Sequence, residues 1–90
     1  MIQLTEQAAQ EIKKIFTDNS YPETACFRIA IIGRNVERPL FVVEDRPGKA
    51  YKVLESLGIK IAVHPISFRH LDGTTIDFSK DVEGGFFVRK

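Results

Sequence analysis

Cysteine is scarce in this sequence, since Cys26 is the only one among 90 residues. A single thiol excludes an intramolecular disulfide framework. It also excludes an iron–sulfur cluster or a structural zinc ion that one protomer holds through several cysteines, because such centres need more than one thiolate. The fold must therefore depend on apolar packing, with or without help from a partner subunit.

Long apolar runs and a charge imbalance are also lacking. No apolar run is longer than Ile29–Ile32, far short of the ~20 residues that a membrane-spanning helix needs. The first residues, Met1–Leu4, contain no basic stretch followed by an apolar one, so we expect no secretory signal and a cytoplasmic location. Thirteen Lys and Arg against twelve Asp and Glu give a net charge of +1, which provides no large positive field for a nucleic-acid backbone.

What remains is the pattern of one small domain over residues 1–90. Apolar residues recur at helical spacing over residues 4–16, with charged residues on the other side, and this predicts an amphipathic helix. Thr5 is its expected N-cap. Pro65 is expected to open a short second helix that runs through Leu71.

Alternating or apolar stretches predict five strands, over residues 25–32, 40–43, 59–63, 75–78 and 86–88. The first two are expected to form a hairpin. Over residues 49–57 the apolar spacing fits either a helix or a short strand, and periodicity alone does not decide between them. Phe27, Phe41 and Phe68 fall at apolar-periodic positions and are expected in the core.

Several short motifs follow one another in a specific order. In the first half, FRI begins at Phe27 and FVVE at Phe41; in the second half, GIKIAV begins at Gly58, SFRHLDGTTIDF at Ser67, and a Gly-Phe pair at Gly85. Each motif alone is weak. In this order and spacing they resemble the HesB/IscA family, the A-type carriers of iron–sulfur cluster assembly, over essentially the whole chain.

The resemblance implies an α+β fold in which small mixed β-sheets pack with an N-terminal helix and a second short helix. It also implies that residues 51–63 form two strands that meet at Gly58.

The sequence departs from the family at the family's cluster ligands. The family's first cysteine lies in a Gly-Cys-Ser-Gly loop, and counting back from Phe41 places Val36 at that cysteine and Arg38 at the second glycine. The other two cysteines form a Cys-Gly-Cys element in a tail, whereas this chain stops at Lys90. The resemblance therefore implies a degenerate member without the three ligand cysteines.

Cys26, His64 and His70 are the remaining candidate metal ligands. Cys26 lies on a predicted strand and is expected to be a small apolar residue with a free thiol, although two copies in a symmetric dimer could share a cluster. His64 and His70 are six residues apart across a helix start, a spacing that matches no standard two-histidine metal site.

Arginines gather around the loop of residues 33–39. Arg34 and Arg38 lie in it, with Arg28 and Arg46 close by in the sequence. Their guanidinium groups could bind a phosphate or an acidic partner. Glu37, Glu44 and Asp45 lie nearby in the sequence, which favours a solvated loop.

The pattern favours a non-catalytic, A-type carrier-like binding or accessory module related to iron–sulfur cluster biogenesis, with no cofactor of its own. Its expected interaction surface is the loop of Arg34, Asn35, Val36, Glu37 and Arg38, because loops generally carry function. The expected partner is a protein of the iron–sulfur assembly system, and a homo-oligomer is left open. No enzyme signature occurs, so catalysis is not expected.

Two alternatives remain open. One is an iron or metal binder that uses Cys26, a histidine or carboxylates at a dimer interface. The other is an anion or nucleic-acid binder that acts through Arg34 and Arg38, which the charge balance makes the less favoured of the two.

Overall fold

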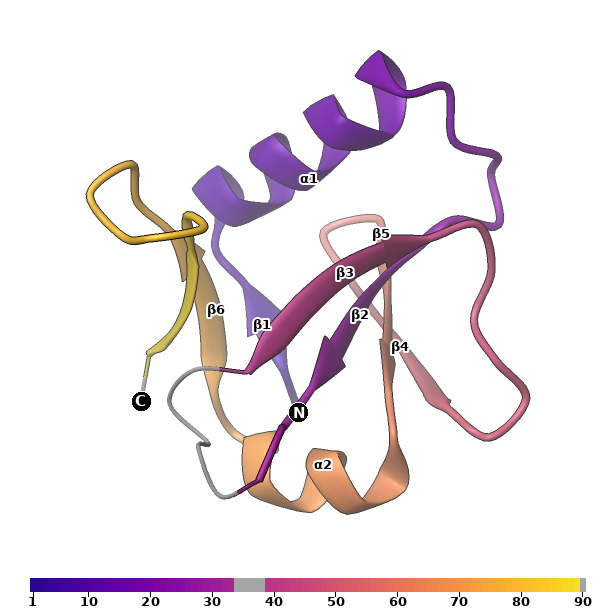
Figure 1. Cartoon of the computed structure of the whole chain (residues 1–90), viewed down its shortest axis with the longest axis vertical. Coiled ribbons are helices and arrows are strands. Elements are labelled where there is room, and N and C mark those ends of the chain that lie inside the picture. The colour runs from indigo at the N-terminus through magenta and orange to yellow at the C-terminus, as the bar shows by residue number, and fades with distance from the viewer. Residues whose placement is uncertain (34–38, 90) are drawn as a thin grey trace.

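The computed structural model describes residues 1–33 and 39–89, which form seven strands and two helices (Figure 1). The elements follow in the order β1 (Gln3–Leu4), α1 (Glu6–Asp18), β2 (Cys26–Ala30), β3 (Leu40–Glu44), β4 (Lys52–Ser56), β5 (Ile59–Val63), α2 (Pro65–Leu71), β6 (Thr75–Phe78) and β7 (Phe86–Arg89). Neither helix of this part of the chain is long and apolar enough to cross a membrane.

The strands form two separate sheets. A four-stranded sheet has the order β3-β2-β5-β4, and a three-stranded sheet has the order β1-β6-β7. Both are mixed, because β2 is antiparallel to β3 and parallel to β5, while β6 is parallel to β1 and antiparallel to β7. The predicted α+β fold of small mixed sheets with two helices is confirmed, as is the hairpin of β2 and β3.

The segment whose spacing was ambiguous forms a β-hairpin. β4 and β5 pair antiparallel with Ser56 opposite Ile59, so the chain reverses through Leu57 and Gly58. Both turn residues have positive φ, 50° and 80°, which is the conformation of a two-residue type I′ hairpin turn. The prediction of two strands that meet at Gly58 is therefore confirmed.

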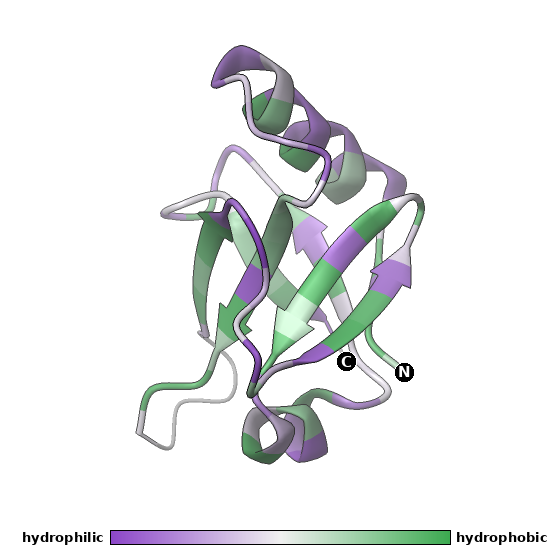
Figure 2. Ribbon diagram, turned by 90° about the vertical axis from the view of Figure 1, so that its right-hand side faces the viewer, coloured by the Kyte–Doolittle hydropathy of each residue, from purple (hydrophilic) through white to green (hydrophobic). Residues whose placement is uncertain are grey.

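Helix α1 crosses one end of the molecule and turns its apolar face toward the sheets (Figures 1 and 2). Ala8, Ala9 and Ile12 on that face are buried. The Thr5 hydroxyl oxygen accepts a hydrogen bond of 3.1 Å from the Ala8 backbone N–H, which confirms Thr5 as the N-cap. The helix begins at Glu6 rather than at residue 4, because residues 3 and 4 form β1 beside β6.

The core lies between the two sheets and beneath α1. Its largest fully buried side chains include Phe27 and Ile29 of β2 and Ile61 of β5 from one sheet, and Ile76 of β6 from the other. Phe27 connects the layers directly, since its ring centroid lies 4.9 Å from that of Phe86 in β7. The predicted core position of Phe27 is confirmed.

Asp77 of β6 connects α1, β6 and β7. Its Oδ1 atom accepts hydrogen bonds from the Thr5 hydroxyl at 2.8 Å and from the Phe78 backbone N–H at 2.7 Å. Its Oδ2 atom accepts a hydrogen bond of 3.0 Å from Nη1 of Arg89. The Thr5 hydrogen bond is the main cause that lowers the pKa of Asp77, with smaller contributions from Phe78 and Arg89 against an opposing effect of burial.

We expect Asp77→Asn to destabilise the protein at neutral pH, because hydrogen bonds to an ionised carboxylate are stronger than those to a neutral amide. Since the folded-state pKa of Asp77 lies below its unfolded value, this contribution to the free energy of unfolding is present above about pH 4 and is lost as the pH falls through the lowered pKa. Urea unfolding of both proteins from neutral to acid pH should give two stability curves that converge in acid. A difference that stays constant with pH would contradict this role.

Gly85 must be glycine for two reasons. Its φ is +87°, and a Cβ atom there would collide with the Phe78 ring. Gly84 has a similar φ of +78°, but a Cβ atom there meets no atom within 4 Å. We expect Gly84→Ala to cost about 1–2 kcal/mol of unfolding free energy from backbone strain alone, and Gly85→Ala to cost roughly 2–5 kcal/mol because overpacking adds to that strain. Equal losses in chemical denaturation would show that the Phe78 contact is unimportant.

Candidate functional site

The predicted interaction surface lies outside the residues that the structure describes. Arg34, Asn35, Val36, Glu37 and Arg38 all belong to it, so the surface stays a prediction. The described chain resumes immediately before β3, whose first residue is Leu40.

Cys26 is the first residue of β2 and lies opposite Glu44 of β3. Its side chain is fully buried and is not in a disulfide. Burial raises the pKa of the Cys26 thiol, and the nearby Glu44 carboxylate raises it further. Since the thiolate is the form that binds metals and attacks electrophiles, the protein holds its only thiol in the form with the least affinity for iron.

The two histidines lie at opposite ends of α2. Nδ1 of His64 accepts a hydrogen bond of 3.2 Å from the Ile66 backbone N–H and so caps the helix. His70 is exposed in the last turn. Positions six residues apart lie ~120° apart around a helix and ~9 Å apart along it, whereas both bonds to one ion would be only ~2 Å long. The structure therefore does not bring His64 and His70 together.

Arg28 is engaged on the outer face of the four-stranded sheet. Its Nε atom lies 2.8 Å from Oε1 of Glu44, a close ion pair without hydrogen-bond geometry. Its Nη1 atom donates a hydrogen bond of 3.2 Å to the Tyr51 hydroxyl, and its guanidinium carbon lies 5.6 Å from the Tyr51 ring centroid. Of the two described arginines near the loop, Arg28 is therefore already paired with Glu44 and Tyr51. Arg46 is exposed and is the one that the anion-binding alternative could still use.

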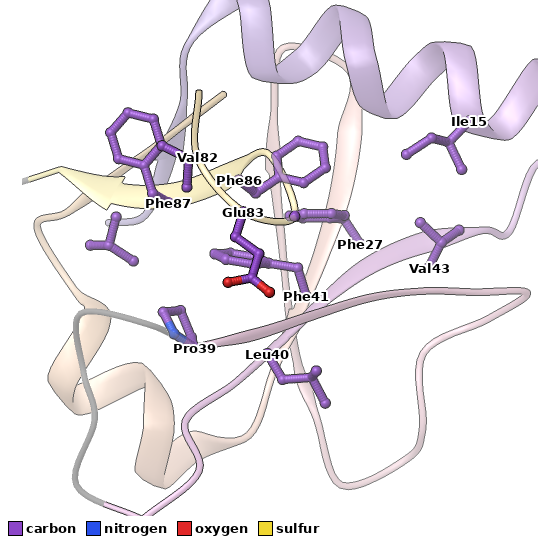
Figure 3. A pocket seen from close by; sticks show the side chains of 12 residues that line it. Ile15, Phe27, Pro39, Leu40, Phe41, Val43, Val82, Glu83, Phe86 and Phe87 are labelled. Carbon is purple, nitrogen blue, oxygen red and sulfur yellow. The ribbon is translucent and has the colours of Figure 1, made fainter. Parts of the chain in front are cut away.

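The structure contains a groove that no pattern in the sequence indicated. It has a volume of about 660 Å³ and lies between β3 on one side and β7 with the preceding turn on the other (Figure 3). Its lining residues are Ile15, Phe27, Pro39, Leu40, Phe41, Val43, Val82, Glu83, Gly84, Phe86, Phe87 and Val88. This volume falls within the range of ligand-binding clefts.

The base of the groove is aromatic. The ring centroids of Phe27, Phe41 and Phe86 lie 4.9–5.8 Å from one another. Phe41 and Phe86 are only partly buried although they pack against the core, so the predicted core position of Phe41 is correct in part. Apolar periodicity identifies the inward face of a strand but does not tell whether another element covers it, and for this reason the groove gave no signal in the sequence.

Comparisons with known proteins agree with this fold. The chain is 31% identical to the iron-sulfur cluster insertion protein ErpA of Blochmanniella floridana, in an alignment that covers 97% of this chain and 76% of that protein. Among solved structures, a protein from Aquifex aeolicus has 28% identity and a TM-score of 0.74, with 97% of this chain and 88% of that one covered. IscA, solved with a [2Fe-2S] cluster, has 23% identity and a TM-score of 0.71 over 99% of this chain and 82% of that one. No model of a known protein family matches the chain.

The fold is thus that of the A-type iron–sulfur proteins. Given the identity to ErpA over most of both lengths, the chain belongs to the HesB/IscA family.

The residues of this chain do not fit the cluster that IscA holds. Such clusters are bound mainly by several cysteine thiolates, and the sequence supplies one cysteine, which is buried in β2. Across residues 1–33 and 39–89, no group of three or more His, Cys, Asp or Glu side chains is arranged to hold a metal ion.

We expect the native protein to react slowly with a thiol reagent such as Ellman's reagent at about pH 8, because Cys26 is buried and its pKa is raised. In denaturant the same thiol should react at the rate of a free cysteine. Rapid labelling of the native protein would contradict this description of Cys26.

The raised pKa of Cys26 should also make the stability of the protein depend on pH. As the pH rises above the ordinary thiol pKa of about 8.5, the unfolded state loses the thiol proton while the folded state keeps it. The free energy of unfolding should therefore fall relative to that of Cys26→Ala.

Proposed function

We propose that this chain is a non-catalytic accessory module of iron–sulfur cluster biogenesis. In this role it binds a protein partner of the assembly system and does not carry a cluster through a three-cysteine site.

The observation that carries the proposal is the state of Cys26. It is the single thiol of the chain, and it lies buried at the start of β2, where its pKa is raised. Cluster assembly on such a residue would require a thiolate in an apolar environment and further ligands that the described residues do not bring to it.

Membership of the family supports the connection to iron–sulfur biogenesis, since the relative at 31% identity is named as a cluster insertion protein. A binding role is supported by the groove between β3 and β7, because an open apolar surface of this kind is typical of sites for partners or ligands. The described residues that line this groove include no acid–base or nucleophilic pair.

Anaerobic reconstitution with ferrous iron and sulfide tests the proposal, with IscA treated in parallel as the positive control. After desalting, we expect this protein to be colourless, and Cys26→Ser to give the same result. Stoichiometric visible absorption that survives desalting would contradict the proposal. If that absorption were lost in Cys26→Ser, a cluster shared between two copies through Cys26 would be the explanation instead.

A further inference from the structure

We propose that the groove between β3 and β7 binds an extended, apolar peptide segment of a partner protein, which adds to the free edge of β3 as a further strand and carries a basic residue opposite Glu83. This inference rests on the proposed function, because it names the kind of partner that such a binding module accepts.

The groove runs along strand edges and not across a sheet face. Successive side chains of a strand point to opposite faces. On β3 the consecutive residues Leu40 and Phe41 both line the groove, and on β7 so do the consecutive residues Phe86, Phe87 and Val88. A surface in contact with both faces of a strand must include the edge between them.

Among residues 1–33 and 39–89, neither of these edges has a further strand beside it. β3 is the outermost strand of its sheet and pairs there with β2, and β7 is the outermost strand of the other sheet and pairs there with β6. An edge strand directs alternate backbone N–H and C=O groups away from its neighbour, where they can pair with an added strand. A small apolar molecule could fill the groove but could not satisfy these backbone groups, so the edge favours a peptide.

The side chains of the groove define the chemistry of that peptide. Its base is formed by Phe27, Phe41 and Phe86, and its walls are mostly aliphatic. Every second side chain of an added strand would point toward this base, which selects apolar residues at alternate positions.

Glu83 supplies the charge that selects a basic residue. Of the described residues that line the groove, it alone carries a charge. It is exposed, and it extends from the turn before β7 toward β3 (Figure 3). A Lys or Arg at the end of the apolar stretch would lie within reach of this carboxylate. Such a rim charge affects specificity and association rate more than total affinity.

The test uses a short, terminally blocked peptide in which valine alternates with threonine and which ends in lysine. The probe is titrated into the full ¹⁵N-labelled chain and followed by backbone NMR. We expect saturable shifts concentrated in β3 and β7, together with slower hydrogen exchange of β3 amides. The same peptide with every backbone amide N-methylated, which lacks backbone donors but keeps the side chains, should not bind.

Two exposed positions provide a matched pair of variants. Leu40 in β3 and Val53 in β4 are 44% and 46% exposed, and they lie on opposite edges of the same sheet. Leu40→Asp should weaken binding by about tenfold or more, as expected when a partly exposed leucine contact is lost, whereas Val53→Asp should leave it unchanged. Glu83→Lys should reduce affinity for the lysine peptide a few-fold and favour a peptide that ends in glutamate.

Several results would overturn the inference. These are the absence of saturable shifts in β3, equal binding of the N-methylated peptide, or an equal loss in Val53→Asp. Self-association of the protein alone that Leu40→Asp abolishes would show that a second copy occupies the edge. None of these outcomes bears on the reconstitution experiment: a colourless protein that fails to bind the peptide would remove this inference and leave the proposed function, and a cluster-bearing protein would remove the proposed function.

Discussion

Burial of Phe27 between the two sheets is the contact on which the rest of the structure depends. β2 is the strand that pairs with both β3 and β5, and Phe27 extends from it to meet Phe41 of its own sheet and Phe86 of the other. Phe86 in turn lies 5.0 Å from Phe78 of β6. Removal of a buried phenylalanine typically costs about 3–5 kcal/mol, a large share of the 5–15 kcal/mol by which a typical domain is stable.

This packing stabilises the fold in place of disulfides or a cysteine-bound metal ion, for which the sequence has too few cysteines. With one thiol, the chain has no disulfide and no metal site built from several cysteines of one protomer, and the aromatic contacts hold strands from two sheets without either. The same residues form the proposed binding groove, because Phe41 and Phe86 pack against the core and also line the groove. The stability of the fold and the proposed partner binding therefore depend on one set of side chains.

Much of the fold could be predicted from local chemistry. Thr5 is a good N-cap before an amphipathic stretch, and it caps α1. Pro65 has a fixed φ that suits the first position of a helix, and α2 begins there. The alternation of Ile59, Ile61 and Val63 predicted a strand because burial of one face imposes a period of two. For residues 49–57 the spacing was ambiguous, and only the family resemblance indicated the hairpin that the structure contains.

Other features could not be predicted because they depend on contacts between distant segments. β1 is two residues long and exists only because β6 lies beside it, so no local pattern marks it. The groove arises where two sheet edges leave Phe41 and Phe86 partly uncovered, and periodicity does not report which apolar residues remain uncovered. Residues 34–38 lie outside the part of the chain that the structure describes. The expected replacement of the family's first ligand by Val36 and the expected interaction surface of Arg34 to Arg38 therefore stay predictions.

We propose that the folded state of this family member needs no iron. Thermal unfolding tests it most directly, with the protein measured alone, with a chelator, and with ferrous iron and sulfide under anaerobic conditions. A ligand present at 100 times its dissociation constant adds about 2.7 kcal/mol to the stability of the folded state, which for a domain of this size raises Tm by roughly 10 °C or more. We predict the same Tm in all three conditions; a rise with iron and sulfide, or a fall with the chelator, would contradict the claim.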